Sequence, residues 1–342
     1  MSDADSGYIE RFKLADPVHG EVAFVELGPR RDALLPVCLF LYGGGGSCES
    51  LLELAPLVTQ LWQRGVLPAC RVITPNVAPW GFYLDDPKRG SAWESLVAER
   101  LLAHIQDHRN VAAQVPVGLV GISMGGYGAL KMAFARPRAF RAVAAVAPMV
   151  EPSLTVAGRR PRNRYHYPPE VPQALLGVQP DASLYAADHP ANRAICQAEA
   201  LRTGALAIYL DAGTADALNA HDGAELLHRV LWDLDIDHEY RLWAGADHVG
   251  PSLLPRLEAA LCWVATRLTS TELALTPLEL AWQSWLDGGA TGSAPPPLPA
   301  TSPLMPRLLR TLLAPLRDAA RSQDPTMQRR FGVLPAVLKP SA

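Results

Sequence analysis

The chain has 342 residues, of which 49% are apolar and 19% are charged, and its formal net charge is −3. This apolar content is enough for a sizeable core and excludes wholesale disorder, and the length suits two domains or one large domain with an extension. The near balance of 31 basic and 34 acidic residues argues against a nucleic-acid-binding protein, which needs a strongly basic face. The sequence contains no uninterrupted apolar run of membrane-spanning length.

The cysteines and the first residues bear on the cellular compartment. The five cysteines are scattered, with no CxxC pair, so neither a disulfide framework nor a metal site is expected. Residues 1–13 lack the basic start and apolar core of a signal peptide. We therefore expect a cytoplasmic protein.

Short apolar runs alternate with longer helical stretches between residues 20 and 268. Strands are expected at Glu21–Leu27, Leu35–Leu41, Cys70–Thr74, Val115–Val120, Ala142–Ala147, Ala205–Leu210 and Glu239–Trp243. Helices are expected at Leu51–Gly65, Ser91–Arg109, Gly126–Arg136, Ala224–Leu234 and Ser252–Leu268. This alternation indicates βαβ units and a doubly wound, mostly parallel sheet, with the functional site at the carboxyl ends of its strands.

Two regions break the alternation. Glu151–Arg202 is rich in Pro, Arg and Tyr without a clean period, and residues 151–202 are interpreted as a lid or substrate-binding insertion. Gly288–Pro303 has the composition of a linker, and a short helix is expected before it at Pro277–Leu286. These features divide the chain into a catalytic domain, 1–270, and a helical C-terminal extension, 271–342.

The end of the extension is basic. Residues 303–342 carry seven basic and two acidic residues, a charge of +5 that leaves −8 for the rest of the chain. Leucines at 308, 309, 312, 313 and 316 predict an amphipathic helix that Pro315 interrupts. Such a tail packs back onto its own acidic body or docks on an acidic partner or a membrane surface, and formation of a homo-oligomer through it is a further alternative.

The segment Gly121-Ile-Ser123-Met124-Gly125-Gly126 follows an expected strand and opens an expected helix. This is the context that a G-x-S-x-G nucleophile elbow requires, because a serine at a sharp, strained turn needs small neighbours two positions away. Ser123 is the predicted nucleophile, and the N–H of Met124 is a predicted oxyanion donor. The alternative is a glycine-rich turn with an incidental serine.

A string of glycines, Gly43–Gly46, follows an early strand. Its backbone N–H groups can bind an oxyanion, and Gly44 is the predicted second donor. A phosphate cradle is the alternative, but the string lacks the GK[ST] ending of a P-loop. Tyr42 and Gly45 beside the predicted donor are expected to contact the substrate.

A nucleophile elbow of this type is followed along the chain first by the acid and then by the histidine, in the order Ser, Asp, His. Asp216 lies in the loop beyond the strand at 205–210 and is the predicted acid, with Asp211 at the strand end as the alternative. His248 follows the last expected strand and is the predicted base, which takes the proton from Ser123 and returns it to the leaving group. Such chemistry needs no cofactor.

The substrate pocket is placed in the insertion. Tyr165, His166 and Tyr167 are predicted to form an aromatic wall, and His189 is a further candidate to line the pocket. His104 and His108 share a helix face, which is interpreted as solvated because no carboxylate is placed to complete a metal site.

Together these motifs resemble α/β-hydrolases of the esterase D or carbohydrate-esterase-1 type, which include S-formylglutathione hydrolases, feruloyl and acetylxylan esterases and mycolyltransferases. GISMGGYGAL at 121–130 is similar to the elbow of that group, and LYGGGGS at 41–47 to its oxyanion loop. DAGTAD at 211–216 and GADH at 245–248 resemble its acid and histidine segments. The resemblance spans about residues 20–268 and implies an α/β-hydrolase fold and hydrolysis of a small-molecule ester through an acyl-serine.

Three departures from the group are visible. Tyr42 stands where the group has His or Asp, Val-Gly-Pro follows His248 in place of an aromatic pair, and residues 270–342 have no counterpart. Serine carboxylesterase activity is the predicted function. An acyltransferase or a peptidase of the same fold, or a non-catalytic interaction protein that uses its tail, are the alternatives.

Overall fold

The computed structural model describes residues 7–31, 34–107, 115–159, 181–269, 277–287, 293–299 and 308. The chain falls into two compact units, Met1–Ser270 and Thr271–Ala342, and each is described by itself. Within the described residues, no helix is both long enough and apolar enough to cross a membrane.

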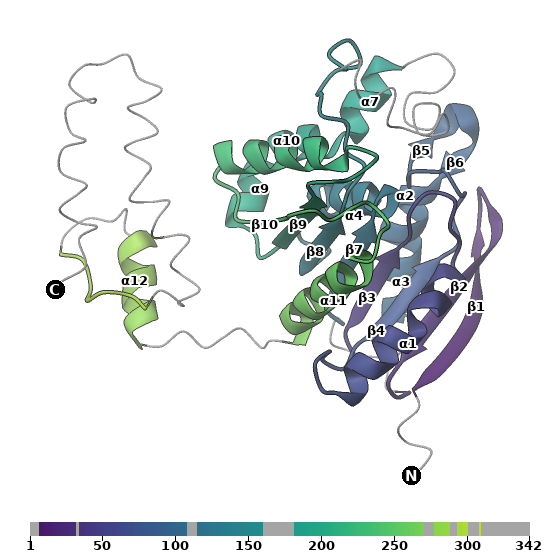
Figure 1. Ribbon diagram of the computed structural model, residues 1–342, viewed down its shortest axis with the longest axis horizontal. Helices are drawn as coiled ribbons and strands as arrows, with labels where there is room; N and C mark the ends of the chain where they lie inside the picture. The colour runs from purple at the N-terminus through teal and green to yellow at the C-terminus, as the bar shows by residue number, and fades with distance from the viewer. Residues whose placement is uncertain are drawn as a thin grey trace. The chain divides into compact units, whose positions relative to one another are not determined.

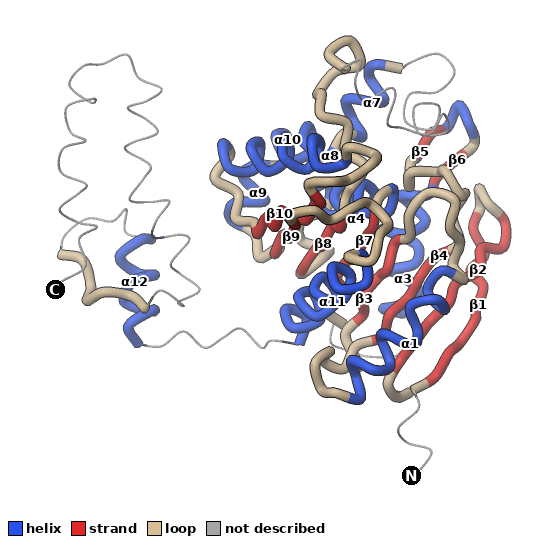
Figure 2. The backbone as a smooth tube through the Cα atoms, viewed as in Figure 1, coloured by secondary structure: helices blue, strands red, loops and turns tan. Residues whose placement is uncertain are grey.

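An eight-stranded sheet forms the centre of the first unit (Figures 1 and 2), in the order β1-β2-β4-β3-β7-β8-β9-β10. Its strands are β1 (Tyr8–Asp16), β2 (Gly20–Gly28), β3 (Val37–Leu41), β4 (Arg71–Pro75), β7 (Val117–Ile122), β8 (Ala142–Val146), β9 (Ala207–Gly213) and β10 (Glu239–Trp243). β1, β2 and β4 pair antiparallel, and every pairing from β4 to β10 is parallel. The predicted doubly wound, mostly parallel fold is therefore confirmed.

The central strands are buried on both faces. Every residue of β3, β4, β7 and β8 is buried, which is why β3, β7 and β8 have continuous apolar runs rather than alternating ones. In the register of the sheet, Leu41 at the end of β3 pairs with Gly121 near the end of β7. The glycine string and the serine turn therefore leave the sheet at the same edge and on neighbouring strands.

Helices cover both faces of the sheet. They are α1 (Ser50–Gln63), α2 (Trp93–Ser95), α3 (Leu102–Asp107), α4 (Met124–Ala135), α7 (Ala182–Asp188), α8 (Pro190–Cys196), α9 (Ala198–Thr203), α10 (Ala220–Asp233) and α11 (Leu253–Thr269). Helix α4 packs on β3, β7, β8 and α8, and α10 packs on β9 and α8. Figure 1 shows α11 and α1 on the opposite face, where α11 packs on β7 and β8.

Three stretches differ from the sequence prediction. Strand β1 was not expected, because it is a sheet edge with mostly exposed, polar side chains. The expected helix Ser91–Arg109 begins instead with strand β6 (Ser91–Ala92), which pairs with β5 (Asp85–Asp86) across a 3-10 turn, Pro87–Arg89.

After α2 the same stretch continues as a π-helical segment, Leu96–Leu101, and then as α3. The third difference is the insertion, which has no clean period in sequence and yet contains α7, α8 and α9 in its described part. These helices are six or seven residues long, too short to show a helical repeat.

The second unit contains α12 (Pro277–Asp287), close to the bounds expected for it. Trp282, Leu286, Leu298 and Leu308 form a small buried cluster, and the Trp282 Nε1–H donates a hydrogen bond of 2.6 Å to the Pro296 carbonyl. Part of the stretch predicted to be a linker is thus packed against α12.

Candidate active site

Ser123 lies at a sharp turn between β7 and α4, with φ 55° and ψ −117°, a backbone conformation that is strained for any residue but glycine. Its two flanking glycines are needed for space. A Cβ on Gly121 would lie 2.1 Å from the Gly125 carbonyl oxygen, and one on Gly125 would lie 1.9 Å from the Leu41 carbonyl oxygen. The Ser123 N–H donates to the Val146 carbonyl on β8, which holds the turn on the sheet.

The structure brings Ser123, His248 and Asp216 together. The Oγ of Ser123 is 2.9 Å from Nε2 of His248, and Nδ1 of His248 is 2.7 Å from Oδ2 of Asp216. The other carboxylate oxygen, Oδ1, accepts a hydrogen bond of 2.8 Å from the Leu218 N–H. His248 and Asp216 are 4% and 6% exposed, so little water competes for these bonds. This arrangement suits proton transfer from the serine to the histidine.

Asp211, the alternative acid, is engaged elsewhere. It is fully buried within β9, where its carboxylate is 2.6 Å from Nη2 of Arg256. Nη1 of the same arginine donates a bond of 2.8 Å to the Asp247 carbonyl, next to His248. The carboxylate of Asp247 accepts hydrogen bonds from the Ala217 and His248 N–H groups, which lower its pKa. These contacts join the loop that carries Asp216 to the loop that carries His248.

The glycine loop, residues 42–48, runs past the serine. A Cβ on Gly43 would lie 3.3 Å from the Ser123 Cβ, so this glycine lets the loop approach closely. Gly44 lies under the indole of Trp80, whose nearest ring atom is 2.2 Å from the position of a Cβ on Gly44. Among the described residues, neither the Gly44 N–H nor the Met124 N–H has a protein acceptor. Both amides are thus free to bind an oxygen anion.

Tyr42 has a different role from the substrate contact expected for it. Its phenol is buried, donates to the Val77 carbonyl and accepts from the Val77 N–H, both at 2.7 Å. Burial also raises the pKa of this phenol. The Gly45 N–H, in turn, donates to the Pro79 carbonyl at 2.7 Å. Tyr42 therefore fastens the glycine loop to the segment that follows β4, and its hydroxyl is not offered to a ligand.

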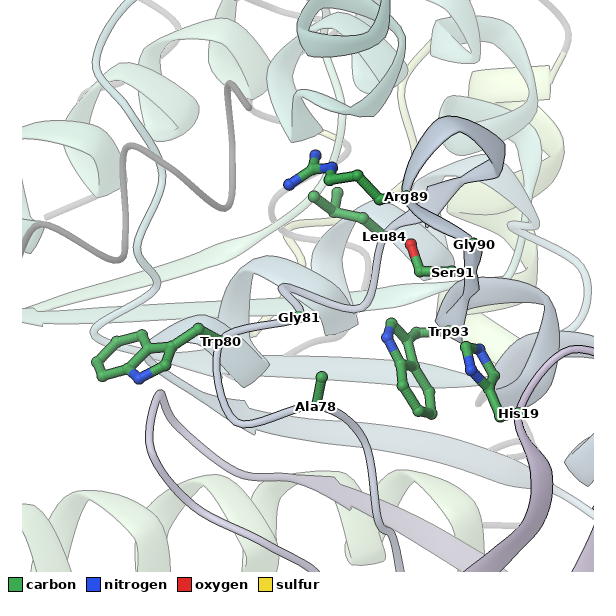
Figure 3. A pocket seen from close by; sticks show the side chains of 9 residues that line it. All are labelled: His19, Ala78, Trp80, Gly81, Leu84, Arg89, Gly90, Ser91 and Trp93. Carbon is green, nitrogen blue, oxygen red and sulfur yellow. The ribbon is translucent and has the colours of Figure 1, made fainter. Parts of the chain in front are cut away.

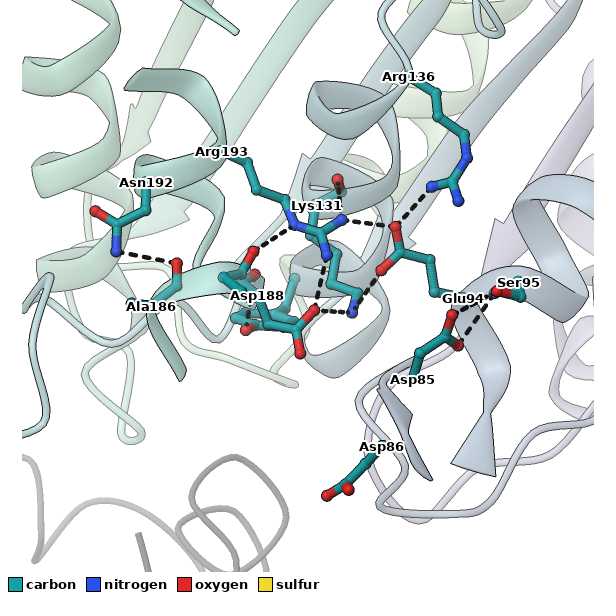
Figure 4. A network of polar contacts seen from close by, with 12 residues as sticks. Asp85, Asp86, Glu94, Ser95, Lys131, Arg136, Ala186, Asp188, Asn192 and Arg193 are labelled. Atoms are coloured by element: carbon teal, nitrogen blue, oxygen red, sulfur yellow. Dashed lines mark hydrogen bonds and ion pairs between the residues drawn. The ribbon is translucent and has the colours of Figure 1, made fainter. Parts of the chain in front are cut away.

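A buried ion network surrounds Lys131 in the second half of α4 (Figure 4). Lys131 is fully buried, with Nζ 2.9 Å from Oε2 of Glu94 and 2.8 Å from Oδ1 of Asp188. Arg193 on α8 bridges the same two carboxylates, and Arg136 also pairs with Glu94. Burial alone would raise the pKa of Glu94, but Lys131 and Arg193 outweigh it and lower that pKa to about 2.

Of the predicted pocket residues in the insertion, the structure describes only His189. Tyr165, His166 and Tyr167 lie outside the described residues. His189 is buried at the start of α8, where Nε2 contacts the Glu151 carbonyl at 2.8 Å and Nδ1 accepts from the Ala191 N–H. Both ring nitrogens thus bond within the protein, and burial lowers the pKa of His189 to about 4.

Metal binding was not expected for His104 and His108. His104 stacks on the ring of Phe12 at 5.5 Å, and His108 lies outside the described part of the chain. Within that described part, no group of three or more His, Cys, Asp or Glu side chains could hold a metal ion.

Sequence reasoning missed the residues that support this site. Trp80 belongs to a segment without periodicity, and the only available sequence signal was the high density of aromatic residues in that segment. Lys131 interrupts an otherwise apolar helix, GYGALKMAFA, and that single charge was the available signal for the ion network. The partner of Asp211, Arg256, carried no local signal at all.

The comparisons with known proteins identify the family of this chain. A family model described as "Putative esterase" matches residues 76–249, just over half of the chain. The chain belongs to this esterase family. It is an ester hydrolase with the α/β-hydrolase fold, as the resemblance implied. The search of curated proteins found no match.

Solved structures similar to this esterase are α/β-hydrolases. A ferulic acid esterase is 18% identical, with a TM-score of 0.61 over 77% of this chain and 99% of that one. An S-formylglutathione hydrolase from Agrobacterium tumefaciens is 22% identical, with a TM-score of 0.58 over 78% of this chain and 98% of that one. A fluorophosphonate-binding serine hydrolase of Staphylococcus aureus is 14% identical, with a TM-score of 0.59 over 76% of this chain and 98% of that one.

Proposed function

We propose that this esterase is a serine carboxylesterase that hydrolyses carboxylic esters through an acyl-serine intermediate. The observation that carries the proposal is the hydrogen-bond chain from Ser123 Oγ to His248 Nε2 and from His248 Nδ1 to Asp216 Oδ2, at 2.9 and 2.7 Å. Ser123 is the nucleophile, His248 the base and Asp216 the acid. All three lie in the unit Met1–Ser270, which we take as the catalytic domain.

In the first step Ser123 Oγ attacks the carbonyl carbon of the ester while its proton moves to His248 Nε2. The carbonyl oxygen becomes an oxyanion, for which the N–H groups of Gly44 and Met124 are the donors. When the tetrahedral intermediate collapses, the bond to the alcohol oxygen breaks, and His248 passes its proton to the departing alkoxide. Asp216 holds the imidazole in the required tautomer and stabilises its positive charge.

In the second step a water molecule takes the place of the alcohol. His248 removes a proton from this water as its oxygen attacks the acyl carbon, and the same two N–H groups hold the second oxyanion. Collapse breaks the bond to Ser123 Oγ, which regains its proton from His248. The carboxylic acid leaves, and the enzyme returns to its starting state without a cofactor.

The test is hydrolysis of p-nitrophenyl esters from acetate to decanoate by the wild type and by Ser123→Ala. We expect the substitution to lower kcat by about 10⁶, because the nucleophile and its base act as one unit. Ser183→Ala, on an exposed serine of α7, is the matched control and retains wild-type kcat. The chain length that gives the highest kcat/KM measures the size of the acyl pocket.

Labelling with a fluorophosphonate probe separates the alternatives. Labelling of the wild type without hydrolysis of any ester would favour an acyltransferase with a narrow donor. Hydrolysis that survives in Ser123→Ala, or a wild type that neither reacts with the probe nor hydrolyses an ester, would refute the proposed mechanism.

A further inference from the structure

A cavity of about 280 Å³ lies beside the glycine loop (Figure 3). It is lined by His19, Ala78, Trp80, Gly81, Leu84, Arg89, Gly90, Ser91 and Trp93. In Figure 3 the indoles of Trp80 and Trp93 lie on either side of the backbone at Ala78 and Gly81. Both tryptophans are half-buried, and both belong to the lining of the cavity.

Trp80 places this cavity next to the proposed reaction centre. The indole covers Gly44, where a Cβ would lie 2.2 Å from its ring, and it also touches the Cβ position of Gly45 at 3.8 Å. Gly43, the preceding residue, lies against Ser123. Because Gly43 and Gly44 are consecutive, with Cα atoms about 3.8 Å apart, Ser123 and the indole contact neighbouring residues of the glycine loop.

The far wall of the cavity is a fixed aromatic surface. His19 stacks on one face of the Trp93 ring, with centroids 3.5 Å apart and planes 3° apart. Its Nε2 accepts a hydrogen bond of 3.1 Å from the Ala92 N–H, and burial lowers the pKa of the imidazole. His19 therefore stays neutral at pH 7 and holds Trp93 in place.

The charge at the rim of the cavity is compensated. The guanidinium of Arg89 pairs with the carboxylate of Asp86, which also accepts from the Lys88 and Arg89 N–H groups. The lining thus consists mostly of flat rings, glycines and apolar side chains, and besides His19 its polar side chains are those of Ser91 and Arg89. A planar, uncharged ring that stacks on indole fits this lining better than a carboxylate or a flexible alkyl chain does.

We propose that this cavity is a subsite for an uncharged aromatic ring of the ester, with Trp80 and Trp93 as its specificity-determining residues. The proposal rests on the proposed esterase function, because Ser123 fixes the position of the ester bond. The ring belongs either to the acyl group or to the alcohol, and both sources share the same contact with the two indoles.

Two pairs of esters test the subsite, each matched in reactivity at the carbonyl group. Benzyl acetate against cyclohexylmethyl acetate places the ring on the alcohol, and ethyl phenylacetate against ethyl cyclohexylacetate places it on the acyl group. We expect the wild type to favour the aromatic member of at least one pair by about fivefold to tenfold in kcat/KM. Within each pair a general loss of activity cancels from the ratio.

Three tryptophan variants locate the effect. Trp80→Ala and Trp93→Ala are expected to bring the ratio close to one, and Trp80→Leu does the same while it keeps most of the side-chain volume. Trp232→Ala, at a 54% exposed position on α10, is the control and keeps the wild-type ratio. A ratio near one in the wild type, or an equal ratio in Trp80→Ala, Trp93→Ala and the wild type, would overturn the subsite.

A measurement without turnover keeps this test apart from the esterase proposal. Saturation-transfer NMR of benzyl alcohol is recorded with Ser123→Ala and with Ser123→Ala combined with Trp80→Ala. Binding that disappears with Trp80 supports the subsite even if no ester is hydrolysed. Binding that is unchanged in the double variant, or absent from both proteins, rejects the subsite whatever the outcome for Ser123.

Discussion

The two ends of helix α4 carry two different arrangements of buried charge. Ser123 precedes the helix and contacts His248, which in turn contacts Asp216, whereas the second half of α4 bears Lys131 between the carboxylates of Glu94 and Asp188. A histidine takes up and releases a proton near neutral pH, while lysine and arginine keep theirs. The first arrangement therefore suits chemistry, and the second fixes the position of the helix on which the chemistry depends.

The largest effects are expected from a comparison of the catalytic with a structural carboxylate, the two aspartates that lie five residues apart. Asp216→Asn is expected to lower kcat by about 10⁴, because an amide no longer selects the His248 tautomer that accepts the serine proton. Asp211→Asn is expected to destabilise the fold by about 3–5 kcal/mol, since it leaves the buried Arg256 without its counter-charge. Steady-state kinetics on p-nitrophenyl acetate and urea unfolding measure the two effects.

The kcat of folded Asp211→Asn should stay within about tenfold of the wild type, the effect of a small shift in the histidine loop. If Asp211→Asn lowers kcat more than Asp216→Asn does, the two carboxylates have been assigned the wrong roles.

Removing the shared carboxylate of the ion network tests the other end of the helix. Glu94→Gln takes away the charge that Lys131, Arg136 and Arg193 have in common, and we expect a loss of about 3–5 kcal/mol in the free energy of unfolding. The kcat of the folded protein should change by less than about threefold. Urea unfolding and turnover of p-nitrophenyl acetate are measured on the same preparation.

The control is Glu199→Gln, in an ion pair whose glutamate side chain is 77% exposed. It should change the unfolding free energy by less than about 1 kcal/mol. A hundredfold fall in kcat at unchanged stability in Glu94→Gln would show that the network takes part in catalysis and would remove the distinction drawn between the two ends of α4.

Acid should weaken the network by a smaller, graded amount. The pKa of Glu94 lies at about 2 in the folded protein against an ordinary value of 4.5, so the unfolded chain takes up the proton first as the pH falls. The stabilisation is complete above pH 4.5 and is lost between about pH 4.5 and 2. At pH 3.5 about 1.4 kcal/mol of it should be gone.

Urea unfolding at pH 6 and at pH 3.5 measures this loss, and Glu94→Gln should lack that part of the pH dependence. An equal pH dependence in the variant and in the wild type would mean that other carboxylates account for the acid sensitivity.

Much of the fold could be predicted because its strands are buried on both faces. Residues 37–41, 117–122 and 142–146 are apolar in unbroken runs, and only a covered parallel sheet accommodates such runs one after another. Strand β1 could not be predicted, since an exposed edge strand places few constraints on its side chains.

The residues of the candidate site also differ in how well the sequence predicts them. Ser123, Asp216 and His248 could be nominated, because each follows a strand end and the parallel sheet brings those ends to one edge. Tyr42 and Trp80 could not be assigned, because their roles depend on which loop packs against which. Asp211 forms an ion pair with Arg256 of α11, and no spacing in the sequence predicts this contact.

The bonds between the glycine loop and the segment after β4 also limit how this esterase can vary. Val77 is held by Tyr42, and two residues later Pro79 is held by Gly45. Between these two anchors the side chain of Ala78 can be exchanged, but a residue added or deleted would break one anchor and carry Trp80 off Gly44. We therefore expect natural and engineered variants to differ here in composition and to agree in length.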